Sequence, residues 1–177
     1  MADTHLLTPR PSSLDADTFV ASYGDVYEHS PWIARLAHEA GLGPEADTAE
    51  GLAAKLAAVF NAADRERQLA VLLAHPDLAG KAAVRGELTA DSSAEQAGAG
   101  LDQCSSEEFE RFQRLNDAYR ARFGFPFIMA VRGRHRLEIL EAFERRLRHD
   151  RDTELATAVE QVNRIALLRL QARAGAV

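Results

Sequence analysis

Apolar residues recur every three to four positions along most of the 177-residue chain. This is the spacing of one face of an α-helix. Residues 105–124 show it clearly, with a predicted inward face made of Phe109, Phe112, Leu115 and Tyr119. The pattern predicts an all-α protein.

Residues with known preferences for helix ends support the same conclusion. Ser30 at the N-cap and Pro31 at the first helical position predict a helix that ends at Gly41. Two further helices, at roughly residues 135–148 and 151–173, finish the chain. We find no internal repeat and no low-complexity linker between the predicted helices.

The segment FGFPFIMAVRG interrupts the helical pattern. Its composition is typical of a strand, but an isolated strand would have no partner in a helical chain. We therefore expect a buried extended segment near residues 125–131. The whole pattern predicts a single-domain all-α bundle of roughly seven to nine helices over residues 13–173. Residues 1–12 would form a flexible N-terminal extension, and residues 174–177 a C-terminal tail.

Composition and charge narrow the class of protein. The formal net charge of −6 argues against broad binding to nucleic acid or to an anionic membrane, because both need a basic face. The single cysteine excludes an intrachain disulfide. Neither a signal peptide nor an apolar run of membrane-spanning length is visible. We therefore expect a cytoplasmic protein that binds neither nucleic acid nor membrane.

His75 ends the helix predicted over residues 64–74 and directly precedes Pro76. A proline disfavours helical geometry in the residue before it, so the helix should stop there. A histidine at this place can be structural, because its positive form suits the C-terminus of a helix. The rigid backbone of Pro76 and the carboxylate of Asp77 are also what a catalytic imidazole needs for its orientation. Position alone leaves both interpretations open.

A second candidate site lies in the sequence SSAEQ. Ser92 and Glu95 have the S-x-x-E spacing of a capping box, in which each side chain caps the backbone N–H of the other residue. The same geometry would place Ser93, Gln96 and unpaired N–H groups at a helix N-terminus, which favours anionic oxygens. Residues 105–108 offer a second box of equal quality, so the motif alone assigns no function.

Arg169 is the third candidate, because it falls on the apolar face of the last helix. One helical stripe contains Leu155, Val159, Val162, Ala166 and Arg169. Arg164 points away from this stripe. Burial of an arginine costs free energy unless the guanidinium meets an anion. A structural salt bridge, a snorkelling side chain or a bound substrate carboxylate would each satisfy Arg169.

Five blocks of the chain, in order, resemble one enzyme family. They cover about residues 19–170 and read YGDVYEHSPW, AHPDLAG, SSAEQAGAGL, RFGFPFIMAVRG and VNRIALLRL. They are similar to the 2-oxo-4-hydroxy-4-carboxy-5-ureidoimidazoline (OHCU) decarboxylases, which act in urate catabolism and yield (S)-allantoin. The resemblance implies an all-helical, cofactor-free carboxy-lyase that binds an anionic small molecule and is commonly a homodimer.

The resemblance also implies site residues by position. His75 and Glu95 match the catalytic histidine and glutamate of the family, and Arg169 matches an arginine that contacts the substrate. The apolar stripe supports Arg169 over Arg164 for this role. The other implied substrate contacts are Pro76, Ser92, Ser93, Ala94, Gln96, Phe127, Ile128, Met129, Ala130 and Val131.

The chemistry of this substrate fits a chain without metal-ligand spacings. Its carboxylate sits on a hydroxyl-bearing carbon next to a C=N bond. That bond can accept the electrons released with CO2, so neither a metal nor pyridoxal phosphate is needed, and we expect no metal site. Two alternatives remain at this point: a non-catalytic helical binding or regulatory module, and a related enzyme that acts on another ureido or imidazolone acid.

Overall fold

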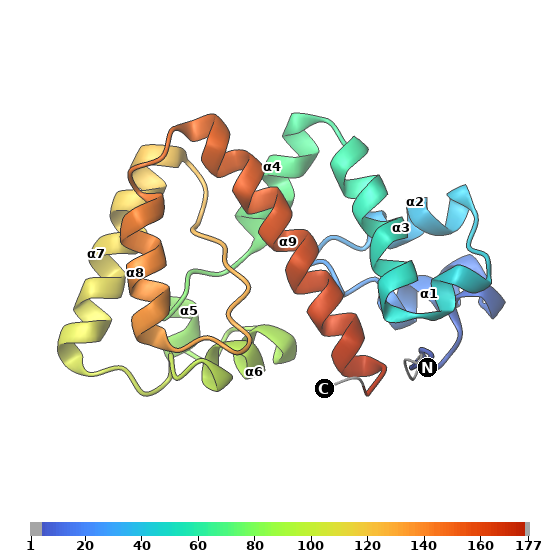
Figure 1. The fold of residues 1–177 in the computed structure, drawn as a ribbon, viewed down its shortest axis with the longest axis horizontal. Coiled ribbons are helices and arrows are strands. Elements are labelled where there is room, and N and C mark those ends of the chain that lie inside the picture. Colours follow the sequence, from blue (N-terminus) through green and yellow to red (C-terminus); the bar gives the residue numbers. More distant parts are fainter. Residues whose placement is uncertain (1–4, 176–177) are drawn as a thin grey trace. The chain divides into compact units, whose positions relative to one another are not determined.

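The computed structural model describes residues 5–175, and within them it is helical (Figure 1). The all-α prediction is therefore confirmed, and the nine α-helices found there fall within the expected number. The only β pairing in that range is an isolated bridge between Leu6 and Thr48. The 3₁₀ helices are η1 (Pro11–Ser13) and η2 (Pro44–Asp47), and the α-helices are α1 (Ala16–Tyr23), α2 (Trp32–Ala40), α3 (Ala49–Ala62), α4 (Arg65–Ala74), α5 (Lys81–Val84), α6 (Ala90–Gly98), α7 (Ser106–Phe123), α8 (Arg136–Arg146) and α9 (Arg151–Arg173).

The residue contacts divide the chain into two units. The first unit comprises residues 1–74 and 163–177, and the second comprises residues 75–162. The division falls directly before His75 and within α9. The domain limits expected from the sequence, residues 13–173 with two terminal extensions, stay a prediction.

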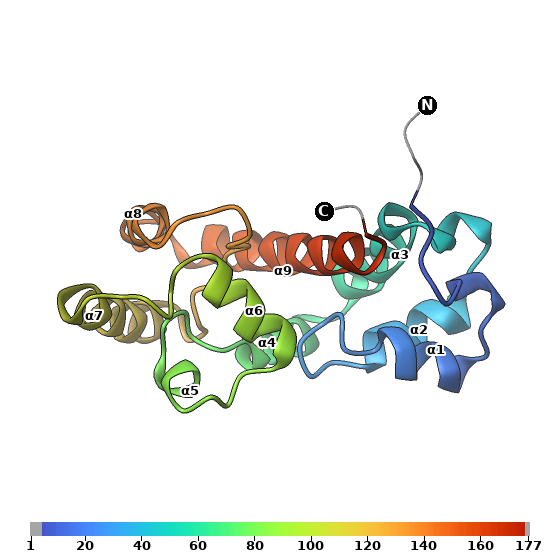
Figure 2. The same cartoon turned by 90° about the horizontal axis from the view of Figure 1, so that it is seen from below.

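In the first unit, α1 and α2 lie side by side, as Figure 2 shows. Asp15 caps α1 by accepting a hydrogen bond from the Thr18 amide. The expected N-terminal extension contributes to this unit as well: Leu7 is fully buried and its amide donates to the Asp47 carbonyl over 2.8 Å. Residues 1–4 lie outside the described residues.

The start of α2 differs from the sequence prediction. Pro31 is the N-cap, so α2 begins at Trp32, and the Ser30 hydroxyl donates to the Glu28 carbonyl instead of capping the helix. The helix thus begins one residue later than predicted, with Pro31 as the N-cap instead of the first helical residue. The end of α2 at Gly41 is confirmed; this glycine has a φ of 100°.

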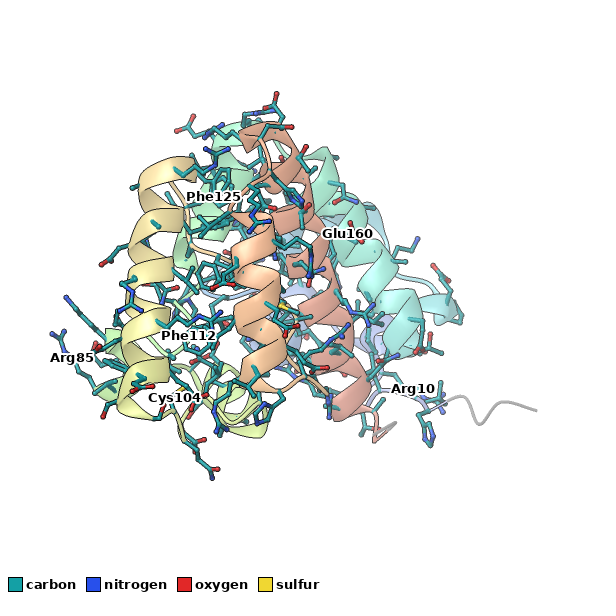
Figure 3. The ribbon with its side chains drawn as sticks, turned by 60° about the vertical axis from the view of Figure 1, so that its left-hand side comes forward. Arg10, Arg85, Cys104, Phe112, Phe125 and Glu160 are labelled. Carbon is teal, nitrogen blue, oxygen red and sulfur yellow. The ribbon has the colours of Figure 1, made fainter. Side chains whose placement is uncertain are left out.

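The second unit is built on α7 and α8, which lie next to each other (Figure 1). Aromatic side chains form its core, and Figure 3 shows Phe112 and Phe125 between the two helix ribbons. Tyr119 is fully buried at the centre of the cluster. Its ring neighbours are Phe123, Phe125, Phe127 and Phe143.

The chain between α7 and α8 contains the expected buried segment. Residues 125–131 form neither helix nor strand, and all of them are buried except Met129, which is half-buried. The ring of Phe127 stacks on that of Phe143 in α8, with 3.9 Å between the ring centroids. This aromatic packing fixes the segment within the second unit.

None of the helices in residues 5–175 is both long enough and apolar enough to cross a membrane.

Candidate functional site

His75 lies where the sequence predicted, immediately after the end of α4 at Ala74. Its side chain is buried, with 6% of its surface exposed. The turn that follows includes Ala79, a non-glycine residue with a φ of +50°. Such a backbone conformation is unfavourable for alanine and persists only where surrounding contacts hold it. The loop carrying His75 therefore has a defined conformation.

Gln96 supplies two of the contacts that hold this loop. Its Oε1 accepts a hydrogen bond from the Ala79 amide (3.0 Å), and its Nε2 donates to the Asp77 carbonyl (3.3 Å). The side chain is 95% buried, since only 5% is exposed. Gln96 thus links the SSAEQ block to the histidine loop within the second unit.

The start of α6 corrects the interpretation of the SSAEQ block. Thr89 is the N-cap and its hydroxyl accepts from the Ser92 amide, so Ser92 is already the third residue of the helix. The Ser92–Glu95 capping box is wrong. The Ser93 amide donates to the Thr89 carbonyl over 2.8 Å. The amides of Ser92 and Ser93 are therefore engaged within the helix, contrary to the expected unpaired N–H groups.

The five residues of the SSAEQ block differ in their exposure to solvent. Ser92 and Gln96 are buried, Glu95 is half-buried, and Ser93 and Ala94 are exposed. This alternation follows from the helix, which directs residues four positions apart to the same side. Substrate contacts from Ser92, Ser93, Ala94, Glu95 and Gln96 remain a prediction.

The buried segment at residues 127–131 is held through its backbone. The Ile128 carbonyl accepts a hydrogen bond from Nη1 of Arg146 (2.7 Å), and the Ala130 amide donates to Oε1 of Gln161 (2.9 Å). The guanidinium of Arg146 also lies over the Phe127 ring, 4.3 Å from its centroid. The Ile128 carbonyl and the Ala130 amide are thus bound by side chains from α8 and α9. The predicted substrate contacts of this segment would therefore have to come from its other polar groups.

Arg146 belongs to a buried network centred on Glu154. The Arg146 Nη2 and Glu154 Oε2 atoms are 2.9 Å apart. The Tyr119 hydroxyl donates a hydrogen bond to Glu154, and His149 Nδ1 lies 2.9 Å from Glu154 Oε1. Burial raises the pKa of Glu154, but the hydrogen bonds from Arg146 and Tyr119 outweigh it, so this pKa is lowered. Burial, followed by the bond to Glu154, raises the pKa of Tyr119. This network favours the ionised form of Glu154, and Arg146 connects it to the Ile128 carbonyl.

Sequence reasoning did not single out Arg146 or Glu154, although a signal for Arg146 was present. Arg146 follows Ile139 by seven residues and Phe143 by three, so it shares their apolar helix face. This is the same argument that selected Arg169. Glu154 has a comparable signal, because it precedes Ala158 by four residues and Ile165 by eleven and so shares a side of the last helix with them.

Arg169 is buried, as the apolar stripe predicted, whereas Arg164 is exposed. Its Nη1 lies 2.8 Å from Oε2 of Glu28, and both side chains are nearly inaccessible to solvent. The same Nη1 donates to the Val26 carbonyl over 3.4 Å. A salt bridge therefore satisfies at least part of this guanidinium. Its partner Glu28 was not predicted.

The predicted site residues are divided between the two units. His75, Pro76, the block at residues 92–96 and the segment at residues 127–131 all lie in the second unit, whereas Arg169 lies in the first. Between residues 5 and 175, no three His, Cys, Asp or Glu side chains are grouped so that they could hold a metal ion.

Comparison with known proteins decides the family. The sequence model described as OHCU decarboxylase matches residues 12–171 of this chain. The chain belongs to the OHCU decarboxylase family. It is therefore a decarboxylase, and family membership favours the enzyme over a non-catalytic helical module.

Individual relatives agree with this family assignment. The chain is 48% identical to the OHCU decarboxylase of Haloferax volcanii over 160 residues, which covers 90% of this chain and 91% of the relative. It is 37% identical to the mouse OHCU decarboxylase, with 93% of this chain and 91% of the relative covered. It is 38% identical to the uric acid degradation bifunctional protein PucL of Bacillus subtilis, of which it covers 31%.

Two solved structures share the fold of this OHCU decarboxylase family member. One is described as (S)-allantoin synthase, with a TM-score of 0.72 and 31% identity, and it matches 92% of this chain. The chain spans about half the length of that protein, 52%. The other is an OHCU decarboxylase crystallised in the presence of (S)-allantoin, with a TM-score of 0.65. At 21% identity over 81% of this chain, the second likeness concerns the fold alone.

Proposed function

We propose that this chain removes CO2 from OHCU and delivers a proton to one face of the product, so that it forms (S)-allantoin in urate catabolism. The observation that carries the proposal is the family match over residues 12–171. It is supported by the buried His75 in a loop that Gln96 holds from the SSAEQ block. This is the arrangement that an oriented proton carrier requires.

The reaction is balanced without an external electron acceptor. The bond between the carboxylate and the hydroxyl-bearing carbon breaks, and its electron pair enters the adjacent C=N bond, whose nitrogen takes up a proton. The hydroxyl then loses its proton and becomes a carbonyl, while the neighbouring ring carbon accepts a proton. One proton is consumed overall for each CO2 released. The protein has to orient the carboxylate and to control the face on which the ring carbon is protonated.

The proposed roles follow from these needs. His75 is the general acid/base, and Glu95 polarises it or binds the ureido group. Arg169 binds the substrate carboxylate, and its ion pair with Glu28 fixes the direction of the guanidinium. Backbone groups of residues 127–131 outside the contacts of Arg146 and Gln161 bind the ring.

The test generates OHCU in situ from urate with urate oxidase and hydroxyisourate hydrolase, and follows circular dichroism. We expect the wild-type protein to produce the signal of one allantoin enantiomer, and the His75→Asn variant to lose it. A loss of about 100-fold or more is expected for removal of a general acid/base. The spontaneous reaction without protein gives optically inactive allantoin.

A matched control replaces a histidine of the same unit that lies at the surface. His135 is the N-cap of α8, and asparagine serves well at such a position, so His135→Asn should keep full activity. A wild-type trace identical to the protein-free reaction would refute the proposed function. A variant at His75 with full activity would keep the function and refute the mechanism.

Assembly as a homodimer and a cytoplasmic location are also proposals. The resemblance to the family suggests the homodimer.

A further inference from the structure

Three side chains of α7 bind the loop that follows His75. They contact three consecutive residues, 77–79, in reverse order, so that the helix and the loop are paired residue by residue. The contacts are Gln113 Nε2 to the Ala79 carbonyl (2.8 Å), Asn116 Nδ2 to the Leu78 carbonyl (3.0 Å) and Arg120 Nε to Oδ1 of Asp77 (3.0 Å). We call Gln113, Asn116 and Arg120 the α7 polar face.

The spacing of these residues explains how one helix can make all three contacts. Gln113, Asn116 and Arg120 lie at intervals of three and four residues, which places them on one side of α7. Their burial differs: Asn116 is 3% exposed, whereas the side chain of Arg120 is 42% exposed. The salt bridge of Arg120 is therefore screened by solvent, and Asn116 is the member whose contact is shielded from it.

One atom of the Asn116 side chain lowers the stability of the folded protein. Its Oδ1 atom is buried and has no hydrogen-bond partner within the described residues. A buried acceptor without a partner costs free energy, and a leucine of similar size would avoid this cost. The other polar atom, Nδ2, donates a hydrogen bond to the Leu78 carbonyl. The side chain therefore gains one buried hydrogen bond at the cost of one buried acceptor without a partner.

The backbone conformation at Ala79 is stabilised by hydrogen bonds with side chains. Ala79 has a φ of +50°, a conformation that an alanine adopts only when the surroundings enforce it. Both of its backbone hydrogen-bonding groups are bound by glutamine side chains, the amide by Gln96 and the carbonyl by Gln113. Only three residues, Pro76, Asp77 and Leu78, lie between Ala79 and His75, and the ring of Pro76 fixes its own φ.

We infer that Asn116, supported by Gln113, is a positioning residue that holds the His75 imidazole in place through the backbone of residues 77–79. The inference rests on the proposed function, in which His75 carries the proton. A general acid/base must stay within hydrogen-bond reach of the atom that it protonates. A small displacement of a catalytic group lowers the rate of the chemical step, so loss of the contacts that hold this loop should lower kcat.

The decisive variant is Asn116→Leu, which removes the donor and the unpaired acceptor together while keeping the size of the side chain. We expect kcat to fall about 10- to 100-fold, because a misplacement of about 1 Å can cost that much. KM should change little, and the melting temperature should stay near that of the wild type, because removal of the unpaired Oδ1 offsets the loss of the hydrogen bond to the Leu78 carbonyl. A role in stability alone would give the opposite result, a lower melting temperature with kcat unchanged.

Phe112→Leu is the matched control, because it changes a buried α7 side chain that donates no hydrogen bond to residues 77–79. It should lower the melting temperature and leave kcat near that of the wild type. Gln113→Leu is a second variant at a half-buried position, for use if Asn116→Leu does not fold. In the His75→Asn background, Asn116→Leu should have no further effect on residual activity, since both changes act through the same group.

A direct readout is the imidazole Cε1–H signal of His75 in NMR spectra, assigned by its absence in His75→Asn. We expect one sharp signal in the wild type and a broadened, shifted or doubled one in Asn116→Leu. This readout does not depend on activity, so it still tests the inference if the wild type fails to turn over OHCU. An unchanged His75 signal in Asn116→Leu would overturn the inference, as would a kcat equal to that of Phe112→Leu.

Discussion

At the scale of single residues, the buried pair of Arg169 and Glu28 shows what a helical pattern can and cannot reveal. The stripe along the last helix predicts that Arg169 is buried, and this is confirmed. The partner is separated from it by 141 residues, and no local spacing points to it. Glu28 lies in a turn with irregular backbone, next to His29 with a φ of 49°. The sequence therefore predicts the need for an anion, and only the structure identifies it.

This pair allows the structural role of Arg169 to be separated from its proposed role in substrate binding. Arg169→Met would leave the Glu28 carboxylate buried without its partner, which should cost about 3–5 kcal/mol of unfolding free energy. The double variant Arg169→Met/Glu28→Leu removes both charges and should recover most of this loss in urea unfolding.

If Arg169 binds the substrate carboxylate, the stability recovered in the double variant will not restore activity. Its KM for OHCU should remain well above that of the wild type. Recovery of both stability and KM would show that Arg169 serves only the salt bridge. The exposed Arg164 provides the control, since Arg164→Met should change neither quantity.

At the scale of helices and loops, one of the two predicted capping boxes is confirmed and the other is wrong. The capping box of Ser105 and Glu108 is confirmed at the start of α7, where a clear apolar pattern follows. In α6, Thr89 and Ser92 are both good N-cap residues, and the two residues between them, Ala90 and Asp91, do not favour either. The structure selects Thr89, which moves Ser92 and Glu95 inside the helix.

The buried segment at residues 125–131 was predicted from its composition, but its support was not. That support comes from Arg146, which bonds to the Ile128 carbonyl and covers the Phe127 ring. Pairing between α8 and an irregular segment cannot be inferred from periodicity, because no repeat links the two. The same holds for the α7 polar face and residues 77–79.

Arg146 offers a test of whether the 127–131 segment contacts substrate. Arg146→Lys keeps the charge but loses the planar fork that spans Glu154 and the Ile128 carbonyl. We expect kcat/KM for OHCU to fall about tenfold, which equals about 1.4 kcal/mol of transition-state stabilisation. Arg145→Lys, at the exposed neighbouring position, should have no effect. Equal kcat/KM values for the two variants would exclude this segment from the substrate site.

At the scale of the whole molecule, stability should depend on pH through Glu154. The pKa of this carboxyl is lowered in the folded protein, so the folded state binds its proton less readily than the unfolded state. Its contribution to stability is complete above the ordinary carboxyl pKa of about 4.3. The contribution is lost as the pH falls from there through the lower pKa of the folded state.

Glu154→Gln is the variant that isolates this contribution, because a protonated glutamate closely resembles glutamine. At pH 7 the variant should be about 3–5 kcal/mol less stable than the wild type, since Arg146 loses its buried counter-charge. As the pH is lowered below about 4.3, protonation of the wild-type carboxyl should bring the two unfolding free energies together. Urea titrations at several values between pH 7 and pH 3 measure this difference. A difference that stays constant over the whole range would show that Glu154 is not held as an anion by the network.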